Sequence, residues 1–396
     1  MSQQQNSFPM GSLVGDPLPG APELAARGQA AVGVRTIELA FPGRLQIPAG
    51  KRDGRFVPGE RKLKAEVWYP AVLTGNEEPA AYTDHAGRKD LGNLTPFILN
   101  GRAFRDARPD PEAGARPVVV ISHGYPGSRF LLCNLAENLS SKGYVVFSIG
   151  HADNTYEDFA ETRSMESALV HRSADQRLVI SEFPRLNREG FLKGLLQPDN
   201  VGLIGFSMGG YGALRTIGAR IGRTVKENFG EIADVVDEEG EWHGLKAVRA
   251  AALFAPATFF TDPDRTDDID IPTIWFCGTA DHVVQYEKVH DYWRGAAKSA
   301  RVFVSYEGCG HNVANNPAPP EAYSMPWELF KRWSDPVWDT RRLNDANIHF
   351  VTAFFDLVLR GEDGRRAYLA PAEADTPIPG FTEGTTAGIR LESMGF

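Results

Sequence analysis

Apolar and polar positions follow two different patterns along this chain. Val34–Phe41 and Leu63–Tyr69 alternate apolar and polar residues, which predicts two strands that pair antiparallel at a sheet edge. From residue 117 onward, short continuous apolar runs alternate with segments of helical periodicity. Continuous apolar strands separated by helices are typical of a parallel sheet that is covered on both faces. The sequence therefore predicts an α/β fold with antiparallel strands near its N-terminus.

The elements of this alternation can be placed along the chain. Buried strands are expected at Pro117–Ile121, Tyr144–Ile149, Val201–Gly205, Ala250–Phe254, Thr273–Cys277 and Arg301–Tyr306. Helices are expected at Phe130–Lys142, Met165–Phe183, Tyr211–Ile221, Tyr286–Lys298 and Arg341–Leu359. No internal repeat is visible.

Composition along the chain suggests one large domain with flanking segments. Residues 1–32 are rich in Gly, Pro, Ser and Ala, which predicts an extended or poorly ordered arm. The domain is expected to span residues 33–370, and residues 371–396 form a Pro/Gly-rich tail. Polar or irregular insertions, which we expect to cover the functional site in part, lie at about 71–116, 222–248 and 313–340.

The overall composition narrows the classes of partner. The formal net charge of −9 argues against nucleic acid or an anionic membrane as the main partner, because both require a basic surface. No apolar run is long enough to span a bilayer, and the N-terminus lacks the pattern of a secretory leader. We therefore expect a cytoplasmic location, although a removed leader stays open, and the sequence does not specify an oligomeric state.

The most informative motif is Gly205-Phe206-Ser207-Met208-Gly209-Gly210, which fits G-x-S-x-G. It follows a predicted strand directly and precedes a predicted helix, which is the context that a nucleophilic serine of this kind requires. Glycines two residues before and after the serine allow a tight, strained turn that holds the hydroxyl clear of the sheet. Ser207 is therefore the predicted nucleophile.

A second motif predicts the oxyanion hole. Ser122-His123-Gly124-Tyr125-Pro126-Gly127 follows the Pro117–Ile121 strand, at the place where the loop after the third strand supplies one backbone donor. We expect the donors to be the N–H groups of Tyr125 and Met208. His123 is expected to brace the loop rather than to transfer protons.

The acid and the base are expected after the nucleophile, in the order Ser, Asp, His. His311 follows the last predicted strand, within a glycine-rich loop that can fold back over Ser207. Asp281 follows the Thr273–Cys277 strand, where a carboxylate can orient the imidazole. Asp262 and Asp264, after the preceding strand, remain rival candidates for the acid.

These residues together predict acyl transfer through an acyl-serine. Ser207 attacks a carbonyl while His311 takes its proton, and water then releases the acyl group. This chemistry needs no metal or cofactor, and a small-molecule ester is the expected substrate. Tyr125, Phe206 and Trp275 are candidate walls of an apolar substrate pocket, although side chains of this kind more often belong to the core, and core packing is favoured for Trp275.

The motifs resemble two groups of α/β-hydrolases. GFSMGG, GTADHVV and GCGHNVANN are similar to bacterial cutinases and polyester hydrolases over Val118–Asn316. The wider chain resembles the platelet-activating-factor acetylhydrolase-like group, also described as predicted dienelactone hydrolases, through GVRTIEL, AEVWYPA, ISHGYPGSR and NDANIHFVTAFFDLVLRG. These resemblances imply the α/β-hydrolase fold and a serine carboxylic ester hydrolase that acts on a small or medium acyl ester.

Several alternatives stay open at this stage. The same residues would serve a polyester hydrolase, a lactonase or an acyltransferase, and a hydrolase-fold binding protein without activity is the remaining reading. The resemblance to polyester hydrolases also raises a disulfide between Cys277 and Cys309. Two reduced thiols are the alternative, and an intracellular location favours them.

Overall fold

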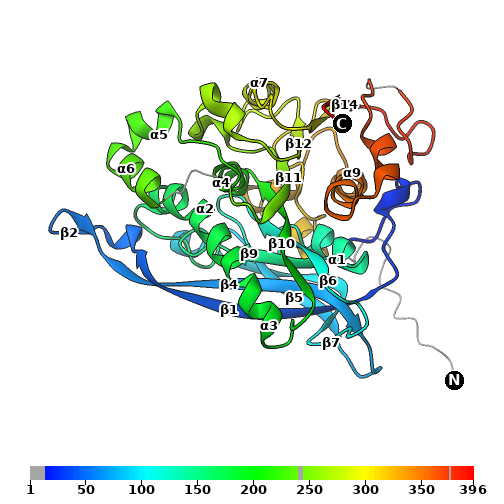
Figure 1. The fold of residues 1–396 in the computed structure, drawn as a ribbon, viewed down its shortest axis with the longest axis horizontal. Helices are drawn as coiled ribbons and strands as arrows, with labels where there is room; N and C mark the ends of the chain where they lie inside the picture. The colour runs from blue at the N-terminus through cyan, green and yellow to red at the C-terminus, as the bar shows by residue number, and fades with distance from the viewer. Residues whose placement is uncertain (1–13, 240–243, 374–375) are drawn as a thin grey trace.

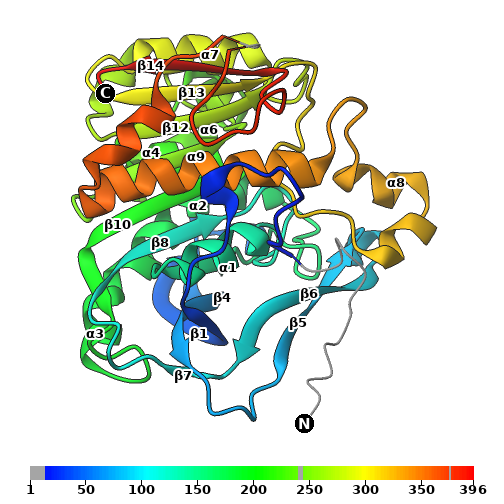
Figure 2. The same cartoon turned by 90° about the vertical axis from the view of Figure 1, so that its right-hand side faces the viewer.

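The computed structural model describes residues 14–239, 244–373 and 376–396. Residues 1–13 of the predicted arm, residues 240–243 of the 222–248 insertion and residues 374–375 of the predicted tail lie outside the described residues. Within the described part of the chain, a sheet of twelve strands is covered by helices on both faces, as Figures 1 and 2 show.

The sheet has the strand order β14-β13-β12-β11-β10-β8-β9-β4-β1-β6-β5, with β7 paired to β4. All neighbours from β13 to β9 are parallel, whereas β4 joins β9 and β1 antiparallel. The bounds are β1 Ala31–Leu45, β4 Pro58–Val72, β5 Pro79–Ala86, β6 Thr95–Arg105, β7 Arg108–Pro109, β8 Arg116–Ser122, β9 Val145–Gly150, β10 Leu196–Phe206, β11 Val248–Phe254, β12 Thr273–Gly278, β13 Arg301–Tyr306 and β14 Ile389–Met394. A separate two-stranded ribbon is formed by β2 Lys51–Arg52 and β3 Arg55–Phe56.

The main helices follow the parallel strands, as expected from the alternating pattern. Figure 2 shows α1 and α9 on the face of the sheet toward the viewer, while α4 and α7 lie behind it. The bounds are α1 Cys133–Ser141, α2 Ser164–Ser181, α3 Phe183–Arg188, α4 Met208–Thr216, α5 Arg223–Asn228, α6 Gly230–Glu239, α7 Tyr286–Gly295, α8 Trp327–Phe330 and α9 Thr340–Arg360. The predicted α/β class, with antiparallel N-terminal strands, is confirmed.

Two parts of the chain differ from the sequence-based expectation. The 71–116 segment was expected to be a polar or irregular insertion, but it contains β5 and β6, which extend the sheet beyond β1. The inward positions of β5 include Asp84 and two alanines, so its apolar alternation is weak although its burial alternates. The expected tail ends in β14, which pairs antiparallel with β13 and is therefore part of the sheet.

The described part of the predicted arm is fixed to the domain. Leu18 N–H donates to Asp345 Oδ2 at 3.0 Å, and Leu24 N–H donates to His349 Nδ1 at 3.2 Å, so the segment lies along α9. Lys142 completes the attachment by donating to Leu24 O and to Thr352 Oγ1.

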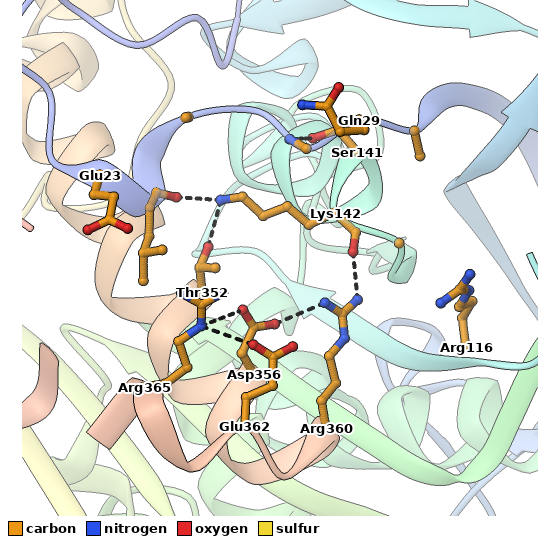
Figure 3. Close-up of a pocket in the computed structure, with 15 residues that line it drawn as sticks. Glu23, Gln29, Arg116, Ser141, Lys142, Thr352, Asp356, Arg360, Glu362 and Arg365 are labelled. Atoms are coloured by element: carbon orange, nitrogen blue, oxygen red, sulfur yellow. Dashed lines mark hydrogen bonds and ion pairs between the residues drawn. The ribbon is translucent and has the colours of Figure 1, made fainter. Parts of the chain in front are cut away.

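Between this segment, α1 and α9 lies a cavity of about 390 Å³, drawn in Figure 3. Lys142 crosses it, and burial lowers the pKa of its ammonium group to about 7. None of the predicted site residues lines this cavity.

Candidate active site

Ser207 stands at the turn from β10 into α4, with φ of 53° and ψ of −113°. This left-handed φ is costly for a serine and is maintained by close packing on both sides. A side-chain carbon at Gly205 would lie 2.5 Å from Gly209 O, and one at Gly209 would lie 2.0 Å from Ser122 O. Only glycine fits at these two positions, which explains the G-x-S-x-G pattern.

Ser207, His311 and Asp281 form a continuous series of hydrogen bonds. The Ser207 hydroxyl lies 3.0 Å from His311 Nε2, and His311 Nδ1 lies 2.8 Å from Asp281 Oδ2. Asp281 is buried, whereas Ser207 and His311 are partly exposed. The structure therefore brings together the three residues that the sequence singled out, with the imidazole between hydroxyl and carboxylate.

Asp281 is held by its own loop. Its Oδ1 accepts hydrogen bonds from the N–H groups of Val283 and Val284 at 2.8 and 3.1 Å, which leaves Oδ2 for the imidazole. The rival Asp262 instead accepts from the N–H of Asp264, and neither rival is bonded to His311 within the described residues.

The residues predicted to supply the oxyanion donors lie in two neighbouring segments, the loop after β8 and the start of α4. A side-chain carbon at Gly124 would lie 3.6 Å from Ser207 Cβ, so the loop after β8 passes directly beside the serine. In the described part of the chain, neither the N–H of Tyr125 nor that of Met208 has a hydrogen-bond acceptor. Ser207 O accepts a hydrogen bond from Ala257 N–H at 3.0 Å. Because the C=O and the N–H of a trans peptide point in opposite directions, the N–H of Met208 points away from Ala257.

The three candidate pocket residues lie in different surroundings. The Phe206 ring centroid is 5.2 Å from that of His311, and the partly exposed Tyr125 ring is 5.4 Å from Phe159. Trp275 is completely buried; its indole donates to Thr273 Oγ1 and its ring lies 6.0 Å from that of Tyr292 on α7. Its assignment to the pocket is therefore corrected, because the side chain fills the core between β12 and α7.

The 313–340 insertion lies next to the histidine loop. Asp335 Oδ2 accepts from Gly310 N–H at 2.7 Å, and the Asn312 amide donates to Lys331 O at 3.1 Å. Beyond these contacts the insertion exposes two aromatic side chains, Tyr323 and Trp327, at 72% and 61%. The insertion thus holds the loop of His311 and presents aromatic surface to solvent.

A second Ser-His-Asp arrangement is fully buried beneath the site, and the sequence-based reasoning did not identify it. Ser122 Oγ lies 2.7 Å from His151 Nε2, and His151 Nδ1 lies 2.8 Å from Asp175 Oδ2. Burial lowers the pKa of His151 to about 4, so this imidazole is neutral. Ser122 is completely buried, so no substrate reaches it, and we interpret the arrangement as support for the loop after β8.

His123 occupies the position expected of a brace. Its ring is completely buried, its Nδ1 donates to Gly124 O at 2.7 Å, and its Nε2 accepts from His151 N–H. Burial lowers its pKa well below the usual range, which keeps the ring neutral.

Other candidate features of the site can be placed as well. All three cysteines are free and buried in the structure, so Cys277 and Cys309 are not joined. Across the described residues, no group of three or more His, Cys, Asp or Glu side chains is arranged to hold a metal ion. Within the same residues, no helix has both the length and the apolar character needed to cross a bilayer.

Comparisons with known proteins agree with the fold. Residues 101–183 match the family described as platelet-activating factor acetylhydrolase, isoform II. A Schizosaccharomyces pombe protein named "Putative phospholipase A2" is 27% identical over 150 residues, a match that covers 32% of this chain and 32% of that protein. The similarity thus spans about a third of that relative's length.

A solved structure is similar over nearly the whole chain. The ferulic acid esterase from Streptomyces cinnamoneus matches with a TM-score of 0.61 and 21% identity, over 94% of this chain and 99% of the esterase. At that level of identity the likeness concerns the fold. The chain therefore has the α/β-hydrolase fold, and over residues 101–183 it resembles platelet-activating factor acetylhydrolase, isoform II.

Proposed function

We propose that this protein is a serine carboxylic ester hydrolase with Ser207 as nucleophile, His311 as general base and Asp281 as the orienting acid. The observation that carries the proposal is the hydrogen-bonded series from the Ser207 hydroxyl through His311 to Asp281, at 3.0 and 2.8 Å. The same three residue types, hydrogen-bonded in the same geometry, activate serine in hydrolases of unrelated fold.

The reaction follows from the positions of these groups. Ser207 Oγ attacks the ester carbonyl as His311 Nε2 takes its proton, and the new negative charge faces the N–H groups of Tyr125 and Met208. His311 returns the proton to the leaving alcohol, which leaves an acyl-serine. Water, deprotonated by His311, then attacks this ester and releases the acid. Asp281 stabilises the imidazolium at both stages.

The proposed substrate is an ester with a small or medium acyl group, and the aromatic side chains near His311 and near the first proposed donor are candidates to contact that group. Phe206 packs near His311, and Tyr125 with Phe159 forms a partly exposed aromatic pair next to the oxyanion donors. A panel should vary acyl and alcohol size and include acetylated and long-chain phospholipids and methyl ferulate, since the names of the similar proteins point to these esters. Competing alcohols in the assay separate hydrolysis from acyl transfer.

The direct test is the Ser207→Ala variant. We expect p-nitrophenyl acetate hydrolysis to be lost and labelling by a fluorophosphonate probe to disappear, while the thermal unfolding midpoint stays near that of the wild-type protein. Ser122→Ala is the matched control, because it removes the hydroxyl of the buried Ser-His-Asp arrangement and should leave the label on Ser207. Full esterase activity in Ser207→Ala would contradict the proposal.

A further inference from the structure

A buried guanidinium lies directly behind the loop that carries the first proposed oxyanion donor. Arg172 on α2 has no exposed surface. Its Nη2 donates to Gly124 O at 2.8 Å, its Nη1 donates to His123 O, and its Nε donates to Asn154 Oδ1 at 3.0 Å. One planar side chain therefore holds two consecutive carbonyl groups of the loop.

Peptide geometry makes these contacts relevant to Tyr125. In a trans peptide unit the C=O and the following N–H point in opposite directions. Arg172 shares the Gly124 carbonyl with His123 Nδ1 and draws it toward α2, so the N–H of Tyr125 is directed away from α2. Gly124 itself lies beside Ser207, since a side-chain carbon at Gly124 would be 3.6 Å from Ser207 Cβ. Holding the carbonyl thus fixes the direction of the donor.

The same helix also contacts the first turn of α4, which carries the second proposed donor. Gln176, one turn after Arg172, donates from Nε2 to Gly209 O at 3.3 Å, next to Met208. At Gly212 the helices α2 and α4 approach so closely that a side-chain carbon there would lie 2.8 Å from Arg172 Cβ. The loop after β8 and the first turn of α4, which supply the two proposed oxyanion donors, are therefore both attached to one face of α2.

We propose that Arg172 is a positioning residue for the oxyanion hole, which orients the Tyr125 N–H by holding the carbonyls of His123 and Gly124. The inference rests on the proposed function and assigns a role in it to a residue that contacts no substrate. Its guanidinium offers donors in a fixed fork, which suits two adjacent carbonyls better than the single ammonium of lysine does.

The charge of Arg172 is retained at neutral pH. Burial lowers the pKa of its guanidinium to about 9, and the nearby Asp175 carboxylate opposes this shift. A buried charge is costly to maintain. The contacts with both carbonyls and with Asn154 offset that cost, and they give a reason for placing an arginine here.

The test compares Arg172→Lys with Arg215→Lys in the full chain. Arg215 is also buried and also donates to two carbonyls, Ala219 O at 2.7 Å and Val236 O at 3.5 Å, but it lies at the far end of α4. Active serine is titrated with a fluorophosphonate, and kcat per titrated site and KM are measured with p-nitrophenyl acetate. A trifluoromethyl ketone, which forms an oxyanion adduct with serine, serves as the inhibitor.

For Arg172→Lys we expect kcat to fall about 10²-fold with KM within about threefold, because only the transition state carries the oxyanion. The inhibition constant of the ketone should rise by the same factor as kcat/KM falls. Arg215→Lys should change kcat less than about twofold, even if its unfolding midpoint falls as much. An equal loss of kcat in both variants, or an unchanged kcat in Arg172→Lys, overturns the inference.

If Arg172→Lys does not fold, Asn154→Ala provides the second test, since it removes the Oδ1 contact that aims the guanidinium and, apart from that, the Nδ2 bond to Ser164 O. We expect its kcat to fall about tenfold at unchanged KM, and an unchanged kcat overturns the inference. The proposed function is judged separately: a wild-type protein that neither hydrolyses esters nor reacts with the probe overturns both proposals, whereas an active wild type with unaffected variants overturns this inference alone.

Discussion

The Asp281→Asn variant probes the proposed triad most sharply, because the structure predicts how the new side chain would sit. The two N–H groups of Val283 and Val284 now bind Asp281 Oδ1, and an asparagine carbonyl oxygen would keep both bonds. The amide NH2 is then left at the position of Oδ2, 2.8 Å from His311 Nδ1. Two donors cannot face each other, so His311 must place its proton on Nε2.

An imidazole protonated on Nε2 cannot accept the proton of Ser207. The expected loss in kcat is about 10⁴-fold, equivalent to about 5 kcal/mol of transition-state stabilisation. The folded structure should change little, since both loop bonds persist. The assay is p-nitrophenyl acetate hydrolysis at pH 8, with kcat per serine titrated by fluorophosphonate and the unfolding midpoint measured in parallel.

Asp335→Asn is the matched control for this variant. Asp335 also binds loop N–H groups, including that of Gly310, but it does not touch His311. We expect its kcat to stay within tenfold of wild type. If Asp281→Asn retained more than a tenth of the wild-type kcat, the assignment of Asp281 as the orienting acid would be refuted.

Two further variants test packing and pH dependence. Gly209→Ala places a carbon 2.0 Å from Ser122 O, so the loop after β8 or α4 must shift. We expect kcat/KM to fall at least about 10²-fold, and near wild-type activity would contradict this. Burial raises the pKa of Asp345 to about 7, so the folded chain holds this proton to a higher pH than the unfolded chain, and stability is lost as pH rises from about 4 to 7. Asp345→Asn keeps an acceptor for Leu18 N–H. In thermal unfolding, we expect its free energy of unfolding to exceed that of wild type by up to about 4 kcal/mol at pH 8, and not to exceed it at pH 4.

The sequence predicts the nucleophile and its two partners because a recurring turn and the order of the strands place them. The turn around Ser207 needs glycine at positions 205 and 209, because a side chain at either would clash with the neighbouring helix or strand. A six-residue pattern is therefore sufficient to identify the nucleophile. Asp281 and His311 follow from the order of strands, because parallel strands end at one edge of the sheet. Their roles in catalysis stay predictions until the variants are measured.

What the sequence does not predict depends on contacts between distant segments. One face of α2 carries Arg172, Asp175 and Gln176, whose spacing places them together. Polar residues with this spacing usually face solvent. Here they are buried because α4 and the loop after β8 pack over them. The assignment of Trp275 to the substrate pocket was wrong for a related reason. Its strand is buried on both faces, and apolar periodicity does not say which face meets the substrate.

The strand β14 has a consequence for how the chain folds. It covers the outer edge of β13, and its residues follow β13 by more than eighty positions in the sequence. Until Met394 has been synthesised, the N–H and C=O groups along that edge have no strand to pair with. An exposed strand edge is a template for pairing with other chains. The nascent protein therefore passes through a stage in which the half of the sheet that carries Asp281 and His311 is open to aggregation, and interrupting synthesis before residue 389 would prolong that stage.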